Sequence, residues 1–180
     1  MSDLQEVRAA VAGARQAAPD LPVVATMTFD TRGFTMMGVS PAQAVAELAE
    51  LNLAALGGNC GNGTDEIEGV VFGMHQTGTR LPLVAKSNAG MPEMIDGRAV
   101  YNGTPAIMGE YARRVRALGA TIIGACCGST PAHIAAIARA LREQPALELH
   151  EIQLASAPAQ RQEPEVSRRA REERRARRSA

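Results

Sequence analysis

The sequence predicts an α/β fold in which four strand–helix units build one parallel sheet. Apolar runs of strand length begin near residues 22, 53, 82 and 120, and a helical pattern follows each of them, so the unit recurs roughly every thirty to forty residues. Glycine and polar residues gather at the carboxyl end of every run. Four units amount to half of a TIM (βα)8 barrel, which has ~250 residues. The periodicity alone also allows a doubly wound sheet, but the polar strand ends favour the barrel, whose active site lies at that face.

The first unit follows an amphipathic helix at residues 3–18, where apolar residues recur at helical spacing before Pro19. LPVVATMTFD is a continuous apolar run, which is typical of a parallel strand covered on both faces. In the helix that follows, Ser40 is the predicted N-cap, Pro41 suits the first helical position and Gln43 completes a capping box.

The other three units repeat this pattern. Their predicted strands are LAALGGNC, LPLVAKSNAG and ATIIGACCG. The predicted helices begin at Asp65, at Thr104-Pro105 and at Thr130-Pro131. We expect a long loop between the third strand and Gly103.

Length and composition indicate one globular domain followed by a tail. The chain has 180 residues, 46% of them hydrophobic, and typical domains have ~100–150 residues. We expect the domain at residues 1–144 and a disordered, arginine-rich tail at residues 145–180, where the apolar periodicity stops. Residues 161–180 hold eight arginines, but four glutamates are interleaved with them and aromatic residues are absent, so we expect no nucleic-acid partner.

The predicted location is the cytoplasm, without a membrane partner. No run approaches the ~18 apolar residues of a membrane span, and the N-terminus lacks the pattern of a signal peptide. The three cysteines are an odd number and two are adjacent, which suits metal binding or catalysis in a reducing compartment better than a disulfide framework.

The cysteines form the candidate metal site. Cys60 lies in GGNCGNG, and Cys126 and Cys127 lie in GACCGST, each at the end of an apolar run. Three thiolates would leave a tetrahedral Zn²⁺ with one open position, as in a catalytic site. Cys60 taken alone is explained at least as well as a small buried apolar residue.

The adjacent pair requires a bend, because neighbouring residues on a regular strand point to opposite faces. Gly124 and Gly128 can supply that freedom. A helix that begins at Thr130-Pro131 would direct unpaired backbone N–H groups toward the sulfurs and lower their pKa from the usual ~8.5.

Other polar residues are weaker candidates. Asp30, Asn59 and Asn88 follow predicted strands, where they either bind substrate or satisfy loop backbone. Lys86 lies inside the third strand, where a Schiff-base role is conceivable but a structural ion pair is the preferred interpretation. We expect surface positions for the histidines, which are His75, His133 and His150.

Three segments resemble the homocysteine S-methyltransferase family: GGNCGNGTDEI, LPLVAKSNAGMPE and GATIIGACCGSTPAHIAAIARAL. The similarity is greatest to bacterial betaine-homocysteine methyltransferases and to the homocysteine domain of cobalamin-dependent methionine synthase, and it extends from about Leu4 to Leu141. It implies a zinc-dependent barrel that transfers a methyl group to the thiol of homocysteine to give methionine. By this resemblance Cys60, Cys126 and Cys127 are the metal ligands, and the open position receives the homocysteine sulfur as a thiolate.

The resemblance also implies that this chain is the C-terminal half of the barrel. The acidic residues that hold the amino acid's ammonium group, and most of the methyl-donor pocket, would lie in the first four units. An isolated half-barrel exposes strand edges and the inner face of its sheet, so we expect a homodimer or a second chain that supplies the other half. The residues present do not select between betaine and a methylfolate or methylcobalamin donor. The alternative function is a non-catalytic zinc-binding remnant, or a subunit that completes a barrel with a partner chain.

Overall fold

The computed structural model describes residues 1–154 of the chain, and residues 155–180 lie outside this description. The elements are α1 (Leu4–Ala17), β1 (Val24–Thr28), α2 (Pro41–Leu48), η1 (Ala49–Leu51), β2 (Ala55–Cys60), α3 (Thr64–His75), β3 (Leu83–Ser87), β4 (Pro92–Ile95), β5 (Arg98–Tyr101), α4 (Pro105–Ala117), β6 (Ala120–Ala125), α5 (Pro131–Glu143) and η2 (Leu149–Glu151). The four predicted strand–helix units are confirmed.

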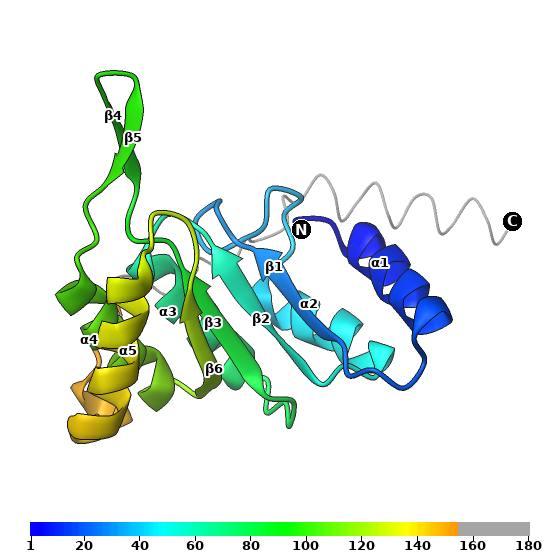
Figure 1. Cartoon of the computed structure of the whole chain (residues 1–180). Helices are drawn as coiled ribbons and strands as arrows, with labels where there is room; N and C mark the ends of the chain where they lie inside the picture. Colours follow the sequence, from blue (N-terminus) through cyan, green and yellow to red (C-terminus); the bar gives the residue numbers. More distant parts are fainter. Residues whose placement is uncertain (155–180) are drawn as a thin grey trace, which may run out of the picture.

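The main sheet has four parallel strands in the order β1-β2-β3-β6, so each strand pairs with the next strand of the same sheet along the chain (Figure 1). A doubly wound sheet reverses its strand order at a switch point, and no such reversal occurs here. Strands that follow one another in chain order are the arrangement found in a (βα)8 barrel. The described residues therefore form the barrel-type half that the sequence predicts.

The helix starts are encoded locally. In α2 the Ser40 hydroxyl accepts a hydrogen bond from the Gln43 backbone N–H at 3.2 Å, and the Gln43 side chain accepts one from the Ser40 N–H at 2.9 Å. This is the predicted capping box, and it satisfies two N–H groups that a helix end leaves without partners. At α4 the Thr104 hydroxyl alone caps the helix, by accepting from the Ile107 N–H at 3.3 Å, and Pro105 is at the first helical position.

The hydrophobic core lies between one face of the sheet and the helices. Helix α3 packs on β2 and β3, and α4 and α5 pack on β6. Side chains of that sheet face, including Met27, Leu56 and Ala85, are fully buried. On the other face Val24 is 52% exposed and Ile122 is 45% exposed. The helices thus cover one face of this sheet, and apolar residues of the other face meet solvent.

Lys86 lies on this open face, in register with Asn59 of β2 and Gly124 of β6. The predicted structural ion pair is wrong for the described residues, because none of the ion pairs within residues 1–154 involves Lys86. Its neighbours across the sheet are an amide side chain and a glycine, so its side chain stays exposed.

The segment expected as a long loop before Gly103 instead contains an antiparallel hairpin, β4–β5. Asp96 and Gly97 form its two-residue turn with φ values of 50° and 74°, the left-handed conformations that such a turn requires. The Asp-Gly dipeptide was the signal that could have predicted it. The hairpin projects beyond the carboxyl ends of the main strands (Figure 1), and Met94 near its tip is 70% exposed.

Residues 145–154, which the sequence assigned to the disordered tail, are placed against the helices. Arg113 donates a hydrogen bond to the Pro145 carbonyl at 3.1 Å, and Arg114 donates one to the Gln153 carbonyl at 2.9 Å. Ile152 and Leu154 are partly buried against the core. The remainder of the predicted tail lies outside the described residues. Within the described part, no helix has the length and apolar character to cross a membrane.

Candidate metal centre

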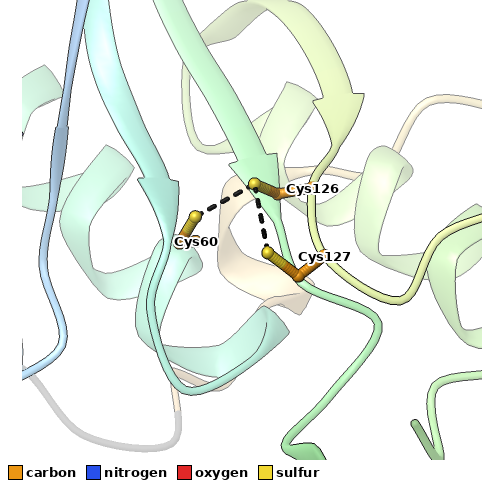
Figure 2. A group of neighbouring side chains, drawn as sticks. All are labelled: Cys60, Cys126 and Cys127. Carbon is orange, nitrogen blue, oxygen red and sulfur yellow. Dashed lines mark hydrogen bonds between the residues drawn. The ribbon is translucent and has the colours of Figure 1, made fainter. Parts of the chain in front are cut away.

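The three cysteines meet at the carboxyl ends of two strands that flank β3. Cys60 is the last residue of β2, and Cys126 and Cys127 directly follow β6. The Sγ atoms of Cys60 and Cys126 are 3.0 Å apart, those of Cys126 and Cys127 are 4.0 Å apart, and all three lie within 4.8 Å of one another. Figure 2 shows the three side chains converging on one point.

The chain turns at both cysteine segments. Cys60 has φ 60°, a left-handed conformation that residues other than glycine seldom adopt, and Gly61 continues the turn at φ 71°. Of the two glycines predicted to give the chain freedom to bend at the cysteine pair, Gly128 has φ 78°, whereas Gly124 lies inside β6. Strand β6 ends at Ala125, so Cys126 and Cys127 lie outside the regular strand, and their sulfurs are 4.0 Å apart although the residues are adjacent.

The sulfur positions fit a zinc ion. A Zn–S bond of ~2.3 Å in tetrahedral geometry separates two sulfur ligands by about 3.8 Å. The pair distances of 3.0 and 4.0 Å lie on either side of this value. Shifts of less than about 1 Å would bring the three sulfurs to ligand positions and leave a fourth position open.

The thiols differ in acidity. Burial raises the pKa of the Cys60 thiol to about 11, and its hydrogen bond with Cys126 adds to the rise. Burial also raises the pKa of Cys126, but the Cys60 thiol and the Cys127 backbone N–H outweigh this effect, and the charge of Lys86 lowers it further, so the Cys126 pKa lies below its usual value. The predicted direction is right for Cys126, but its causes are the Cys60 thiol, the neighbouring Cys127 and Lys86, and the start of α5 is not among them. At Cys60, which lies outside the pair for which the lowering was predicted, desolvation of the thiolate dominates.

Asn88 lies between the two cysteine loops. Its Nδ2 donates to the Gly61 carbonyl at 2.9 Å, and its Oδ1 accepts from the Cys127 N–H at 3.0 Å. The residue is 8% exposed. Of the two roles that the sequence left open, this geometry supports the satisfaction of loop backbone.

Asn59 and Asp30 border the site from β2 and from the end of β1. The Asn59 Nδ2 donates to the Cys60 Sγ at 3.1 Å and to the Thr28 hydroxyl at 3.2 Å. Asp30 accepts a hydrogen bond from the Thr31 hydroxyl at 3.1 Å, and its carbonyl accepts one from Asn62 at 2.9 Å. Asn59 therefore contacts the candidate centre directly, and Asp30 contacts the loop that follows Cys60. Substrate binding by either residue stays a prediction.

Glu66 supports the Cys60 loop, a role that the sequence analysis missed. Its carboxylate accepts hydrogen bonds from the backbone N–H of Asn62 at 2.7 Å and of Gly33 at 2.9 Å. It thereby joins the loop after Cys60 to the loop after β1. Its place in the first turn of α3 was the available signal, because carboxylates there commonly bind loop N–H groups.

His133 was expected at the surface, and this prediction is wrong. It is 8% exposed, and its Nε2 lies 2.8 Å from the Gly103 carbonyl. Its Nδ1 accepts from the Thr130 N–H at 3.0 Å, which completes a capping box at the start of α5. The third helical position faces back toward the N-cap, so this histidine closes the helix end and binds the loop before α4. His75 and His150 are exposed, as predicted.

Comparison with known proteins agrees with this arrangement. Residues 1–141 match the family model described as homocysteine S-methyltransferase. The methionine synthases of Mycobacterium tuberculosis and Mycobacterium leprae are each 31% identical over 144 residues, a match that covers 77% of this chain and 12% of each relative.

Solved structures give the same result. The homocysteine methyltransferase MmuM from Escherichia coli is similar in its oxidized form, with a TM-score of 0.59 and 27% identity over 77% of this chain and 42% of that one. Its metallated form has a TM-score of 0.57 and 27% identity over 76% of this chain and 41% of that one. This chain thus spans less than half of the length of these structures and a smaller part of the methionine synthases. The chain belongs to the homocysteine S-methyltransferase family.

Proposed function

We propose that this chain carries the zinc-binding part of a methyltransferase that converts homocysteine to methionine. The observation that supports this most directly is the convergence of three cysteine sulfurs to within 4.8 Å at the carboxyl ends of parallel strands. In barrels this end of the sheet carries the active site. Thiolate ligands suit a reducing compartment, so we place the protein in the cytoplasm.

Cys60, Cys126 and Cys127 would hold the ion and leave one position for a substrate thiol. A bound zinc ion supplies a positive charge that keeps a coordinated thiol deprotonated at neutral pH. Asn59 donates a hydrogen bond to the Cys60 sulfur, which stabilises its negative charge. Lys86 adds a positive charge beside the cysteines, and its effect on the Cys126 pKa has the same direction.

In the transfer, the homocysteine thiol gives its proton to solvent and its sulfur attacks the methyl carbon of the donor. The new sulfur–carbon bond forms as the bond between methyl group and donor breaks, and that electron pair leaves with the donor. We propose a donor of the betaine or the methylfolate or methylcobalamin type. The open sheet face and its edge strands β1 and β6 suit a second set of strand–helix units, from another copy or from a partner chain.

The metal is tested by measuring the zinc content of the purified chain. We expect about one zinc per chain, and loss of that zinc in Cys126→Ser, because two remaining thiolates do not form a structural or catalytic zinc set. Ser129→Ala is the matched control, because the Ser129 hydroxyl is buried and has no hydrogen-bond partner among the described residues. Unchanged zinc in Cys126→Ser would refute the three-cysteine site.

Catalysis is tested separately, by mass-spectrometric detection of methionine from homocysteine and each donor, with and without the product of the adjacent reading frame. Methionine in either sample supports the enzyme. Zinc binding without methionine in both samples would instead favour the non-catalytic subunit.

A further inference from the structure

Lys86 lies in the row of the main sheet that directly precedes the cysteines. Its Cα partners on the neighbouring strands are Asn59, the residue before Cys60, and Gly124, which lies two residues before Cys126. Residues that are in register on parallel strands point to the same face of a sheet, and here this is the open face. The Lys86 side chain therefore shares that face with Asn59, next to both cysteine segments.

The Lys86 side chain lies against β6. A Cβ added at Gly124 would be 3.6 Å from the Lys86 Cγ, so the first part of the lysine stem lies beside Gly124. Further along, the Cys126 backbone N–H donates to the carbonyl of Ser87 at 2.7 Å, which keeps Cys126 next to β3. Two residues of strand cover about 7 Å, a distance that a lysine with its flexible four-carbon stem can span. The ammonium group can thus reach the edge of the candidate metal centre.

A cavity of about 380 Å³ extends from this point along the open face of the sheet. Lys86 and Asn59 line it on the side of β2 and β3, and mostly apolar residues line it toward β1 and α1, among them Val24 and Val7. Ligand sites typically have ~300–1,000 Å³ and combine an apolar lining with a few polar groups. Because Asn59 donates to the Cys60 sulfur at 3.1 Å, the cavity borders the candidate metal centre.

The charge of Lys86 has no protein partner among residues 1–154. All ion pairs of these residues use arginine, and Lys86 is the only lysine of the chain. Its side chain is exposed, on a sheet face that also carries the apolar residues Val24 and Ile122. A cation that lines a cavity beside a thiol-binding position suits a thiol compound that carries an anionic group, and homocysteine has such a group in its carboxylate.

We propose that Lys86 binds the carboxylate of the homocysteine whose sulfur occupies the open metal position, and so makes the site selective for thiols that carry an acid group. The inference rests on the proposed function, which supplies the thiol-binding position. The ammonium group donates a charge-assisted hydrogen bond to a carboxylate oxygen. Attachment at both the sulfur and the carboxylate fixes the orientation of the substrate, which favours attack on a methyl donor in one direction.

The test is a titration of the Co²⁺-loaded full chain with three thiols, followed by the thiolate-to-cobalt charge-transfer absorption, which rises when a further thiolate binds. Homocysteine has a carboxylate and an amino group, γ-mercaptobutyrate lacks only the amino group, and γ-mercaptopropylamine lacks only the carboxylate. We expect Lys86→Met to bind homocysteine and γ-mercaptobutyrate about fivefold more weakly than the parent, the upper end for a solvent-accessible ion pair. It should bind γ-mercaptopropylamine as tightly as the parent or more tightly, because the lost charge repels the amine.

The controls separate the carboxylate from other effects. Each thiol is compared with itself on two proteins, so the different acidities of the three thiols cancel. Arg98→Met is the matched variant, because it removes a positive charge at an exposed position of the β4–β5 hairpin, and we expect parental affinity for all three thiols. Lys86→Arg keeps the charge and should keep the preference for carboxylate-bearing thiols. High salt should reduce that preference in the parent, because it screens solvent-accessible charges.

Unchanged binding of homocysteine by Lys86→Met, or an equal loss for all three thiols, would overturn the inference. An equal effect in Arg98→Met, or a Lys86→Arg variant that behaves like Lys86→Met, would also overturn it. Lys86→Gln gives the same comparison if Lys86→Met does not fold. A cobalt-loaded parent that binds none of the thiols refutes the thiol position of the proposed function. A parent that binds them while Lys86→Met matches it refutes only the role of Lys86.

Discussion

Replacing Arg114 by methionine should leave a buried carboxylate without its partner. Glu68 of α3 has a side chain that is 3% exposed, and it accepts hydrogen bonds from Arg114 of α4 at 2.9, 3.0 and 2.8 Å. Removal of one member of a buried pair costs about 3–5 kcal/mol. Because the Arg114 side chain is itself 25% exposed, we expect the lower end, a loss of about 3 kcal/mol in the free energy of unfolding at neutral pH.

The loss should depend on pH. Burial raises the pKa of Glu68, and the hydrogen bonds and charge of Arg114 act against this rise. Without Arg114 the folded-state pKa rises further above that of the unfolded chain. A carboxyl group with a raised folded pKa contributes stability that is fully present below its unfolded pKa, about 4.3, and is lost as the pH rises through the folded value. The destabilisation should therefore be small near pH 4 and complete at neutral pH.

Urea unfolding followed by far-ultraviolet circular dichroism, at pH 4.5 and pH 7.5, measures this difference. Arg8→Met is the control, because its partner Glu47 is 47% exposed and such pairs contribute about 0–1 kcal/mol. Equal losses at the two pH values would refute the reasoning. So would a Glu68→Leu, Arg114→Met double variant as unstable as the single one, because replacement of both charges by apolar groups removes the desolvation penalty.

Two further predictions concern the residues around the cysteines. Lys86→Met should raise the pKa of the Cys126 thiol in the metal-free protein, because the charge of Lys86 lowers that pKa. The pH profile of alkylation at Cys126, read by tandem mass spectrometry, should therefore move to higher pH. An unchanged profile would contradict the proximity of the two side chains. Gly128→Ala should loosen the β4–β5 hairpin, because the new Cβ would lie 2.2 Å from the Tyr101 ring. Gly97→Ala at the hairpin tip is the control, because Gly97 also has a positive φ but a Cβ there would meet nothing within 4 Å. Limited proteolysis should cut the hairpin faster in Gly128→Ala than in Gly97→Ala. Equal rates would contradict the view that the contact between Tyr101 and Gly128 holds the hairpin in place.

Local sequence signals predicted most of the fold. The Ser40 capping box, the Pro-initiated helices and the apolar strand runs each depend on residues that are neighbours in the chain, and the structure confirms them. The β4–β5 hairpin carried such a signal as well, in Asp96-Gly97. Its strands are exposed and lack a buried face, so they do not show the hydrophobic pattern by which strands are usually recognised.

Side-chain environments were less accessible to prediction. His133 is a polar residue in the first turn of a helix, and its burial depends on the Gly103 loop that packs over it. Lys86 has no ion pair among residues 1–154, and this depends on which residues occupy the same face of β2 and β6. In both cases the deciding neighbour is distant in sequence, so no local pattern could identify it.

The sequence by itself determined the parallel strand–helix units and the presence of three cysteines at strand ends, because both follow from short-range periodicity and from glycine placement. Only the tertiary structure decided that the sulfurs of Cys60 and Cys126 meet across β3 and that Asn88 joins their loops. It also decided that burial raises the pKa of Cys60, whereas the pKa of Cys126 is lowered. These properties depend on strand order, register and desolvation. Such quantities arise when segments far apart in the chain pack together, and they have no counterpart in any single stretch of sequence.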